Sequence, residues 1–347
     1  MPKGLSANLD FLRSVAVLLV LAQHLSRRTV GEGSDAIPTS HLGLFGVLIF
    51  FVHTSLVLMY SMERSGLRRF SLARDFYVRR IFRIYPLSIL AVLAAVVLHL
   101  NSNINGIAGL SRGPLPGWKA ILAQLLLVQN LVHVKSIVNV LWSLPLELQM
   151  YVFLPLLFAW TRRGKLFWPL LGLWTASLAA AVIQPHVAWL GRASLLRFIP
   201  CFLPGIIAFV LPRIQRLRSF LWPIFILGLV VGFTLKPALE TGWFLCLLLG
   251  LGIPCFQEIQ AGWLRTASNR IATYSYGIYI SHQFCIWFAL GVLAGWPLAV
   301  RVGMLIASLV ITPIVLYHGL EEPMIRVGMK LAKRMREKYD VKLAIAA

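Results

Sequence analysis

The sequence contains few charged residues, and acidic residues are especially scarce. Charged side chains make up 13% of its 347 residues, whereas an ordinary soluble domain carries about 25%. That shortage excludes an ordinary soluble globular domain, and a hydrophobic content of 59% points the same way. Because about 20 apolar residues span a bilayer, a chain of this length can supply about ten spans. We therefore expect a polytopic helical membrane protein.

Cysteine is also scarce, and several familiar motifs are missing. The four cysteines lie inside apolar segments without CxxC spacing, so we expect neither a metal site nor an extracellular disulfide framework. The sequence has no Gly-rich phosphate loop and no repeat of about 20 to 50 residues. It also lacks a separate cleavage pattern after its first apolar run, so we expect no signal peptide to be removed.

Long uninterrupted apolar runs predict helices that cross the membrane. Strands of a membrane barrel would alternate apolar and polar residues over about ten positions, and this sequence does not. The expected fold class is therefore all-α. An apolar window selects eleven candidate spans, near residues 9–25, 42–62, 84–100, 118–134, 141–160, 166–184, 195–212, 219–235, 241–256, 270–290 and 297–319.

The distribution of positive charge indicates which candidates cross. If all eleven cross from a cytoplasmic N-terminus, the basic clusters at 162–165 and 213–218 lie outside, against the positive-inside rule. Without segment 118–134, ten spans remain, both termini are cytoplasmic and 24 of the 33 basic residues lie inside. That segment is polar for a span, which favours a re-entrant or interfacial helix; a tilted eleventh span is the alternative. The net charge of +21 thus indicates topology rather than nucleic-acid binding.

Ionisable residues inside predicted spans are candidate functional residues, because a charge at membrane depth is costly. Arg13 and His24 lie eleven positions apart in the first predicted span. In a helix this spacing places them about 16 Å apart along the axis and within about 20° of the same face. The alternative is that Arg13 extends to lipid phosphates and His24 caps the helix at the interface.

Other candidates lie in three further segments. Glu147 either fixes helix packing or orients a histidine, and the sequence leaves open whether it reaches His24. If helical, Arg80 and Arg83 are one turn apart, a spacing suited to clamping phosphates through bidentate hydrogen bonds, with attraction to lipid head groups as the alternative. His282, in the ninth of ten spans, is by itself typical of a hydrogen-bonded structural histidine.

These residues fall in motifs that resemble those of one family, the integral membrane acyltransferases of the acyltransferase-3 type. The resemblance covers nearly the whole chain, and seven motifs occur in the family's order. One departure is Thr54-Ser55, where the family usually has Ser-Gly. The matching motifs are Leu9–Arg13 with His24, Gly46 with Phe50–Val52, Phe76–Pro86 with its R-x-x-R pair, Trp142–Tyr151, Arg197–Gly205, Ser275–His282 and Glu321–Pro323.

The resemblance implies a ten-helix acyltransferase domain over residues 1–325, followed by a basic cytoplasmic tail at 326–347. Many relatives carry an appended esterase-like domain, and we expect this chain to be a stand-alone transferase without one. It implies transfer of an acyl group, most simply acetyl, from acyl-CoA to a hydroxyl of a cell-surface or exported sugar. The implied partners are acyl-CoA, a carbohydrate or glycolipid acceptor and the bilayer of a bacterial cytoplasmic membrane. No metal is implied, and the oligomeric state stays open.

The resemblance also assigns roles to residues. His24 acts either as a general base or as the carrier of the acyl group, and Glu147 orients His24 or positions the acceptor. A transporter or flippase of a glycan or small molecule is the alternative function, but no inverted repeat or matched pair of broken helices supports it. Arg13, Arg80 and Arg83 are expected to bind CoA, and Trp142, Ser143, Tyr279 and His282 to line the substrate path.

Overall fold

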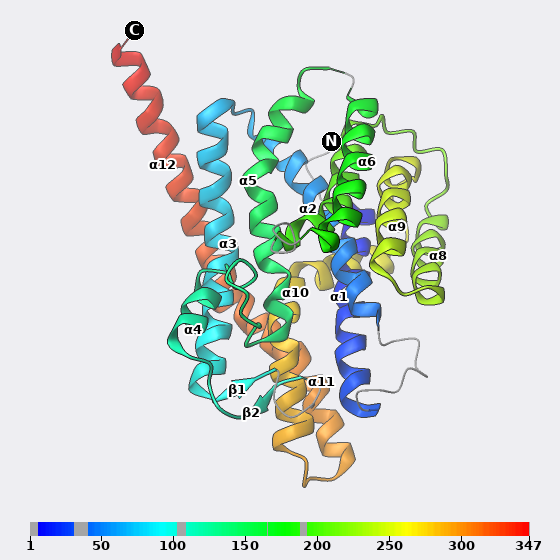
Figure 1. The fold of residues 1–347 in the computed structure, drawn as a ribbon, viewed down its shortest axis with the longest axis vertical. Coiled ribbons are helices and arrows are strands. Elements are labelled where there is room, and N and C mark those ends of the chain that lie inside the picture. The colour runs from blue at the N-terminus through cyan, green and yellow to red at the C-terminus, as the bar shows by residue number, and fades with distance from the viewer. Residues whose placement is uncertain (1–5, 31–40, 103–108, 165, 188–192, 347) are drawn as a thin grey trace.

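A computed structural model describes residues 6–30, 41–102, 109–164, 166–187 and 193–346. Most of these residues are helical, and the only strands among them form one short antiparallel pair, β1 (Leu100–Asn101) with β2 (Ser111–Arg112). Figure 1 shows the helices as a bundle, with β1 and β2 near its lower end. The predicted all-α class is therefore confirmed.

Six described segments are long and apolar enough to cross a membrane. Three further helices are apolar but shorter, and one long helix, α10, is more polar. The number of helices that cross the membrane remains a prediction. The long segments contain α1 (Ala7–Val30), α2 (Leu42–Ser65), α3 (Arg69–Val97), α5 (Leu144–Thr161), α6 (Phe167–Ile183) and α11 (Leu298–Leu316); the others are α7 (Ile199–Val210), α8 (Leu221–Leu235), α9 (Leu239–Gly252) and α10 (Gly262–Trp287).

Segment 118–134 forms only one short helix, α4 (Trp118–Leu125), followed by turns. Its eight residues extend about 12 Å, far less than the about 30 Å of a hydrocarbon core. The polar residues explain the break. Gln124 and Gln129 donate side-chain hydrogen bonds to the carbonyls of Lys135 and Leu141, at 2.9 and 3.0 Å. The structure therefore has no helix in this segment that is long enough to span the membrane.

The C-terminal segment is helical rather than an extended tail. A π-helical turn, Tyr317–Glu321, joins α11 to α12 (Glu322–Ala346), which runs beside α3 and projects beyond the bundle (Figure 1). The predicted domain boundary at residue 325 falls inside α12. A close approach supports the packing, because a Cβ added to Gly328 would lie 2.6 Å from the Cβ of Phe82 on α3.

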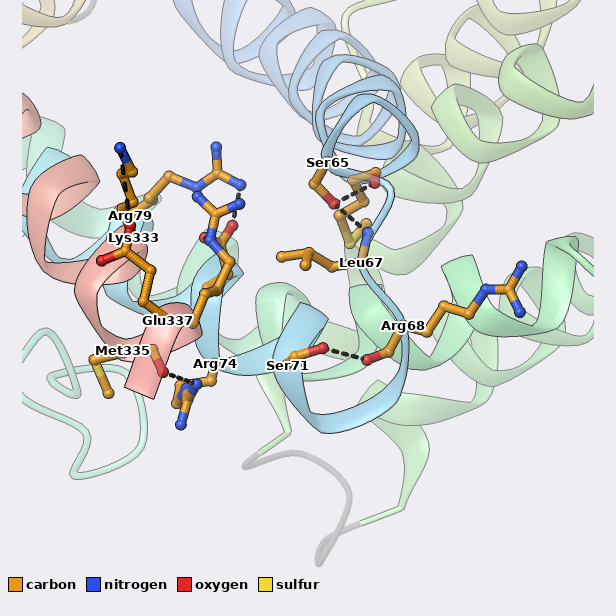
Figure 2. Close-up of polar contacts among 12 residues, drawn as sticks. Ser65, Leu67, Arg68, Ser71, Arg74, Arg79, Lys333, Met335 and Glu337 are labelled. Carbon is orange, nitrogen blue, oxygen red and sulfur yellow. Dashed lines mark hydrogen bonds and ion pairs between the residues drawn. The ribbon is translucent and has the colours of Figure 1, made fainter. Parts of the chain in front are cut away.

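Polar contacts tie α12 to the basic first half of α3. The Nη2 of Arg74 donates to the carbonyl oxygen of Met335 at 2.6 Å (Figure 2). The buried carboxylate of Asp75 pairs with Arg79 on its own helix and with Arg336 on α12, whose Nε lies 3.2 Å away. The helix α3 begins at Arg69, well before the predicted span at 84–100. The prediction missed this first half because an apolar window does not detect a basic helix.

At the centre of the bundle, α1 packs between α2 and α10. The α1–α2 approach depends on a small residue: a Cβ added to Gly46 would lie 2.5 Å from the carbonyl oxygen of Ala16. The same helix α1 contacts α10 through Ser14, whose hydroxyl lies 2.8 Å from the carbonyl oxygen of Ser268. This arrangement aligns the polar positions of α1 with those of α2 and α10.

Candidate active site

A cavity of about 280 Å³ lies between α1, α2, α3, α5 and α10. Four arginines line it, namely Arg13, Arg64, Arg80 and Arg83. Three of them, Arg13, Arg80 and Arg83, are the residues that the sequence predicted to bind an anionic donor. The tertiary structure therefore brings α1 and α3 together at one cationic cavity.

The arginines of α3 face the cavity because they are one helical turn apart in a regular helix. The Nη2 of Arg83 lies 3.7 Å from Oε1 of Glu321, whose side chain is fully buried. Arg79 is not among the residues that line the cavity and instead pairs with Asp75 on the same helix. Neighbouring arginines of one helix thus serve two different sites, and only the pair predicted from the R-x-x-R spacing lines the cavity.

Glu147 lies inside this cavity and accepts a hydrogen bond from the hydroxyl of Tyr151, one turn later in α5. Its electrostatic neighbours are Arg80, Arg13 and Arg83. Glu147 lines the cavity with the four arginines, and the carboxylates of Glu321 and Asp10 interact with arginines of the cavity from outside its lining. The cavity therefore keeps a surplus of positive charge, which suits an anionic ligand.

Ser143 and Tyr279 form one wall of the cavity. Their hydroxyl oxygens lie 2.7 Å apart, and the Tyr279 hydroxyl donates to the carbonyl oxygen of Val140 at 2.6 Å. Because a tyrosine has only one hydroxyl proton, Ser143 is the donor in the first bond. Trp142 lies elsewhere: it packs against Phe198, with ring centroids 5.6 Å apart, and is not among the residues that line the cavity.

His24 lies outside the arginine cavity, beside a small pocket that Arg28, Gln283 and Trp287 also line. Its Nδ1 lies 3.3 Å from Nε2 of Gln283 on α10, and its ring centroid lies 5.1 Å from that of His282. No hydrogen bond or ion pair between described residues joins Glu147 to His24. The sequence left open whether Glu147 reaches His24, and in the structure the two residues lie in different pockets.

His282 lies between the cavity and His24. Its ring centroid is 6.3 Å from that of Tyr279, which lines the cavity, and 5.1 Å from that of His24. Its side chain is fully buried, and its Nδ1 lies 3.0 Å from the carbonyl oxygen of Ile278. Three rings on α10 and α1 thus connect the arginine cavity with the His24 pocket.

Sequence reasoning missed three polar residues of these sites. His53 lines the cavity from the middle of α2, and the criterion that selected Arg13, an ionisable residue within an apolar span, also applies to it. Arg64 also lines the cavity, although it lies in the basic stretch that follows the second predicted span. Gln283 directly follows His282 in the sequence, but only the packing of α10 against α1 shows that it contacts His24.

These features define an integral membrane protein with an arginine-lined cavity and a separate histidine pocket. A family model described as an acyltransferase domain, that of the acyltransferase-3 type, matches residues 6–317 of the chain. The chain therefore belongs to the acyltransferase-3 family and is a membrane acyltransferase. Comparisons with curated proteins and with solved structures find no match.

Proposed function

We propose that this protein transfers an acyl group, in the simplest case acetyl, from acyl-CoA to a hydroxyl of a cell-surface or exported sugar. The observation that carries the proposal is the arginine-lined cavity inside a chain of the acyltransferase-3 family. Phosphate groups are the ligands that clustered guanidinium groups bind best, through paired hydrogen bonds. A CoA thioester brings such phosphates together with the acyl group.

The size of the cavity suggests how a donor would enter. At about 280 Å³ it lies just below the about 300 to 1,000 Å³ of pockets that enclose small ligands. Only part of an acyl-CoA would fit inside, with the nucleotide near the mouth. Arg64 suits that position, because its side chain is exposed although it lines the cavity. Arg80, Arg83 and Arg13 would then hold the phosphates and the inner part of the donor.

His24 is the proposed base. As the acceptor hydroxyl oxygen bonds to the thioester carbonyl carbon, His24 takes the hydroxyl proton, the carbon–sulfur bond breaks and the CoA thiolate leaves. The proton then passes to the thiolate, which yields the ester and free CoA. Formation of an acyl-imidazole on His24 is the alternative route to the same products. In either route, Tyr279 and His282 lie between the arginine cavity and His24.

The proposed location is a bacterial cytoplasmic membrane with both termini in the cytoplasm, where acyl-CoA is made. The helices support one orientation, because α2, α5, α7 and α9 end near the end of the bundle at which α1 and α10 begin. Contacts there include Asn8 with Gln257, at 3.0 Å, and Arg213 with Tyr60, at 3.5 Å. The basic clusters at 162–165 and 213–218 directly follow α5 and α7, which supports a cytoplasmic face there under the positive-inside rule.

The direct test uses the purified protein in sealed vesicles with radiolabelled acetyl-CoA and candidate envelope glycans. We expect label to appear in the glycan as an alkali-labile ester. Passage of unmodified glycan across the vesicle membrane, without label transfer, would instead support a transporter or flippase. Mass analysis of surface glycans from a deletion strain then identifies the acceptor through the acetyl group that is lost.

A further inference from the structure

Gln283 is a buried residue next to His24 whose amide is only half matched. Its side chain is 2% exposed, its Nε2 lies 3.3 Å from Nδ1 of His24, and its Oε1 has no hydrogen-bond partner among the described residues. A buried amide oxygen without a donor costs free energy. Rotation of the amide by 180° exchanges the two atoms, so that Oε1 lies against Nδ1 of His24 and Nε2 takes the position that Oε1 now occupies.

The rotated amide also determines the protonation of His24. An amide oxygen only accepts hydrogen bonds, so contact with Oε1 requires a proton on Nδ1. A neutral imidazole carries one proton, and Nε2 is then left with a free lone pair. That is the form a general base needs, because the lone pair receives the proton of the acceptor hydroxyl.

His282 contributes a second unmatched acceptor beside His24. A carbonyl oxygen only accepts, so the contact with Ile278 requires a proton on Nδ1 of His282. Its Nε2 is then an acceptor, and it is buried without a hydrogen-bond partner among the described residues. Two buried acceptors, Oε1 of Gln283 and Nε2 of His282, therefore lie near His24. An acceptor placed there can take a hydrogen bond from a protonated nitrogen of the His24 ring.

We propose that Gln283 is a positioning residue for His24. Its side-chain oxygen accepts the Nδ1–H of His24, keeps Nε2 unprotonated before the reaction, and stabilises the imidazolium that forms when Nε2 takes the acceptor proton. This proposal rests on the proposed acyl transfer for its chemical consequence. The hydrogen bond itself can be tested independently of turnover.

The first test measures the tautomer directly. We expect ¹⁵N NMR of histidine-labelled protein in detergent to show His24 protonated at Nδ1 and unprotonated at Nε2, with the signal assigned from a His24→Asn variant. In Gln283→Leu the two tautomers should become mixed. A wild-type His24 protonated at Nε2 alone, or a tautomer unchanged in Gln283→Leu, would overturn the proposal without any reference to the transferase activity.

The second test measures transfer of label from radiolabelled acetyl-CoA to the glycan fraction of envelope membranes that contain the native acceptor. Gln283→Leu should lower kcat about tenfold, equivalent to about 1.4 kcal/mol, while the KM for acetyl-CoA stays unchanged. Cys285→Ala is the matched control, since Cys285 is buried two positions later in α10 and should keep wild-type kcat. Full activity in Gln283→Leu beside an inactive His24→Ala would refute the positioning role and leave the proposed function standing.

Gln283→Glu provides a readout that a merely structural role would not change. The groups with charge or titration near His24 are His282 on α10 and Arg27 and Arg28 on α1, and none of the described groups facing it is a carboxylate. A carboxylate at position 283 would accept the Nδ1–H and stabilise the imidazolium further. The acidic limb of the kcat/KM profile should therefore move to higher pH, with activity retained above it. A limb that does not move would contradict the proposal.

Discussion

The arginine cavity and the His24 pocket are two polar regions of one helical bundle, and they are built on opposite principles. The cavity is large and cationic, with Arg13, Arg80 and Arg83 near Glu147. The His24 pocket is small, and His24 contacts the amide of Gln283 and the imidazole ring of His282 there. The first arrangement suits binding of a polyanion, and the second suits movement of a proton.

Two helices connect these regions. Arg13 and His24 lie on α1, while Tyr279 and the pair His282 and Gln283 lie on α10, separated by one turn. A membrane acyltransferase needs to hold its donor and its reacting hydroxyl in different surroundings, since one is a polyanion and the other is neutral. The comparison therefore suggests that binding and chemistry can be altered separately by mutation.

The largest expected effect comes from His24→Ala, which removes the proposed base. We expect kcat to fall by about 10²- to 10⁴-fold, the usual contribution of a general acid or base, with little change in the dissociation constant for acyl-CoA, because His24 does not line the cavity. Label transfer and equilibrium binding of acetyl-CoA to the purified protein measure the two quantities. Normal turnover in this variant would remove His24 from the mechanism.

Arg80→Ala and Arg83→Ala should show the opposite pattern. A hydrogen bond to a charged group contributes about 1.5 to 3 kcal/mol, so each change should weaken acyl-CoA binding about 10- to 100-fold with a smaller change in kcat. Isothermal titration with acetyl-CoA is the measurement. Arg79→Ala is the matched control, because Arg79 pairs with Asp75 on the same helix; equal weakening in all three variants would indicate a general charge effect instead of a cavity.

Glu147→Gln tests which region Glu147 serves. Glutamine can still accept the Tyr151 hydrogen bond, but the cavity loses a negative charge, so we expect acyl-CoA to bind a few-fold more tightly, by about twofold to fivefold. The pH profile of kcat/KM should stay as in the wild type. A large fall in kcat with a displaced pH limb would instead join Glu147 to His24, the role that the family resemblance implied.

The smallest effect is expected for Arg64→Gln at the mouth of the cavity. Exposed charged contacts contribute about 0.2 to 1 kcal/mol, so acyl-CoA binding should weaken by about twofold to fivefold. Salt screens such contacts strongly, and the difference from the wild type should disappear when binding is measured at about 1 M salt. A large, salt-independent loss would show that Arg64 works as a buried cavity residue, like Arg80 and Arg83.

Much of this arrangement could be predicted because it depends on local sequence. Apolar runs locate the helices, and the R-x-x-R spacing alone places Arg80 and Arg83 on one face. The polar residues of segment 118–134 similarly favour a re-entrant or interfacial helix over a span, and α4 is only eight residues long. In these cases the deciding interactions lie within a turn or two of the same helix.

The contacts between distant helices could not be predicted in this way. The basic C-terminal segment gives no apolar signal, yet α12 packs along α3 through Arg336 and Asp75. The sequence around Glu147 does not show which arginines it lies near. Its position among the arginines follows from the rotation of α5 relative to α1 and α3. Gln283 is an ordinary polar residue until α10 brings it to His24, 259 positions away in the chain.

The sequence by itself determined that the chain is a helical membrane protein, which residues are costly enough in a membrane to serve a function, and which family its motifs resemble. Those properties follow from side-chain hydropathy and from the helical repeat. Only the tertiary structure decided that the arginines and Glu147 share one cavity, and that His24 lies apart with Gln283 and His282. The physical reason is that packing between helices fixes their rotation and depth, and these depend on interhelical contacts that no local pattern records.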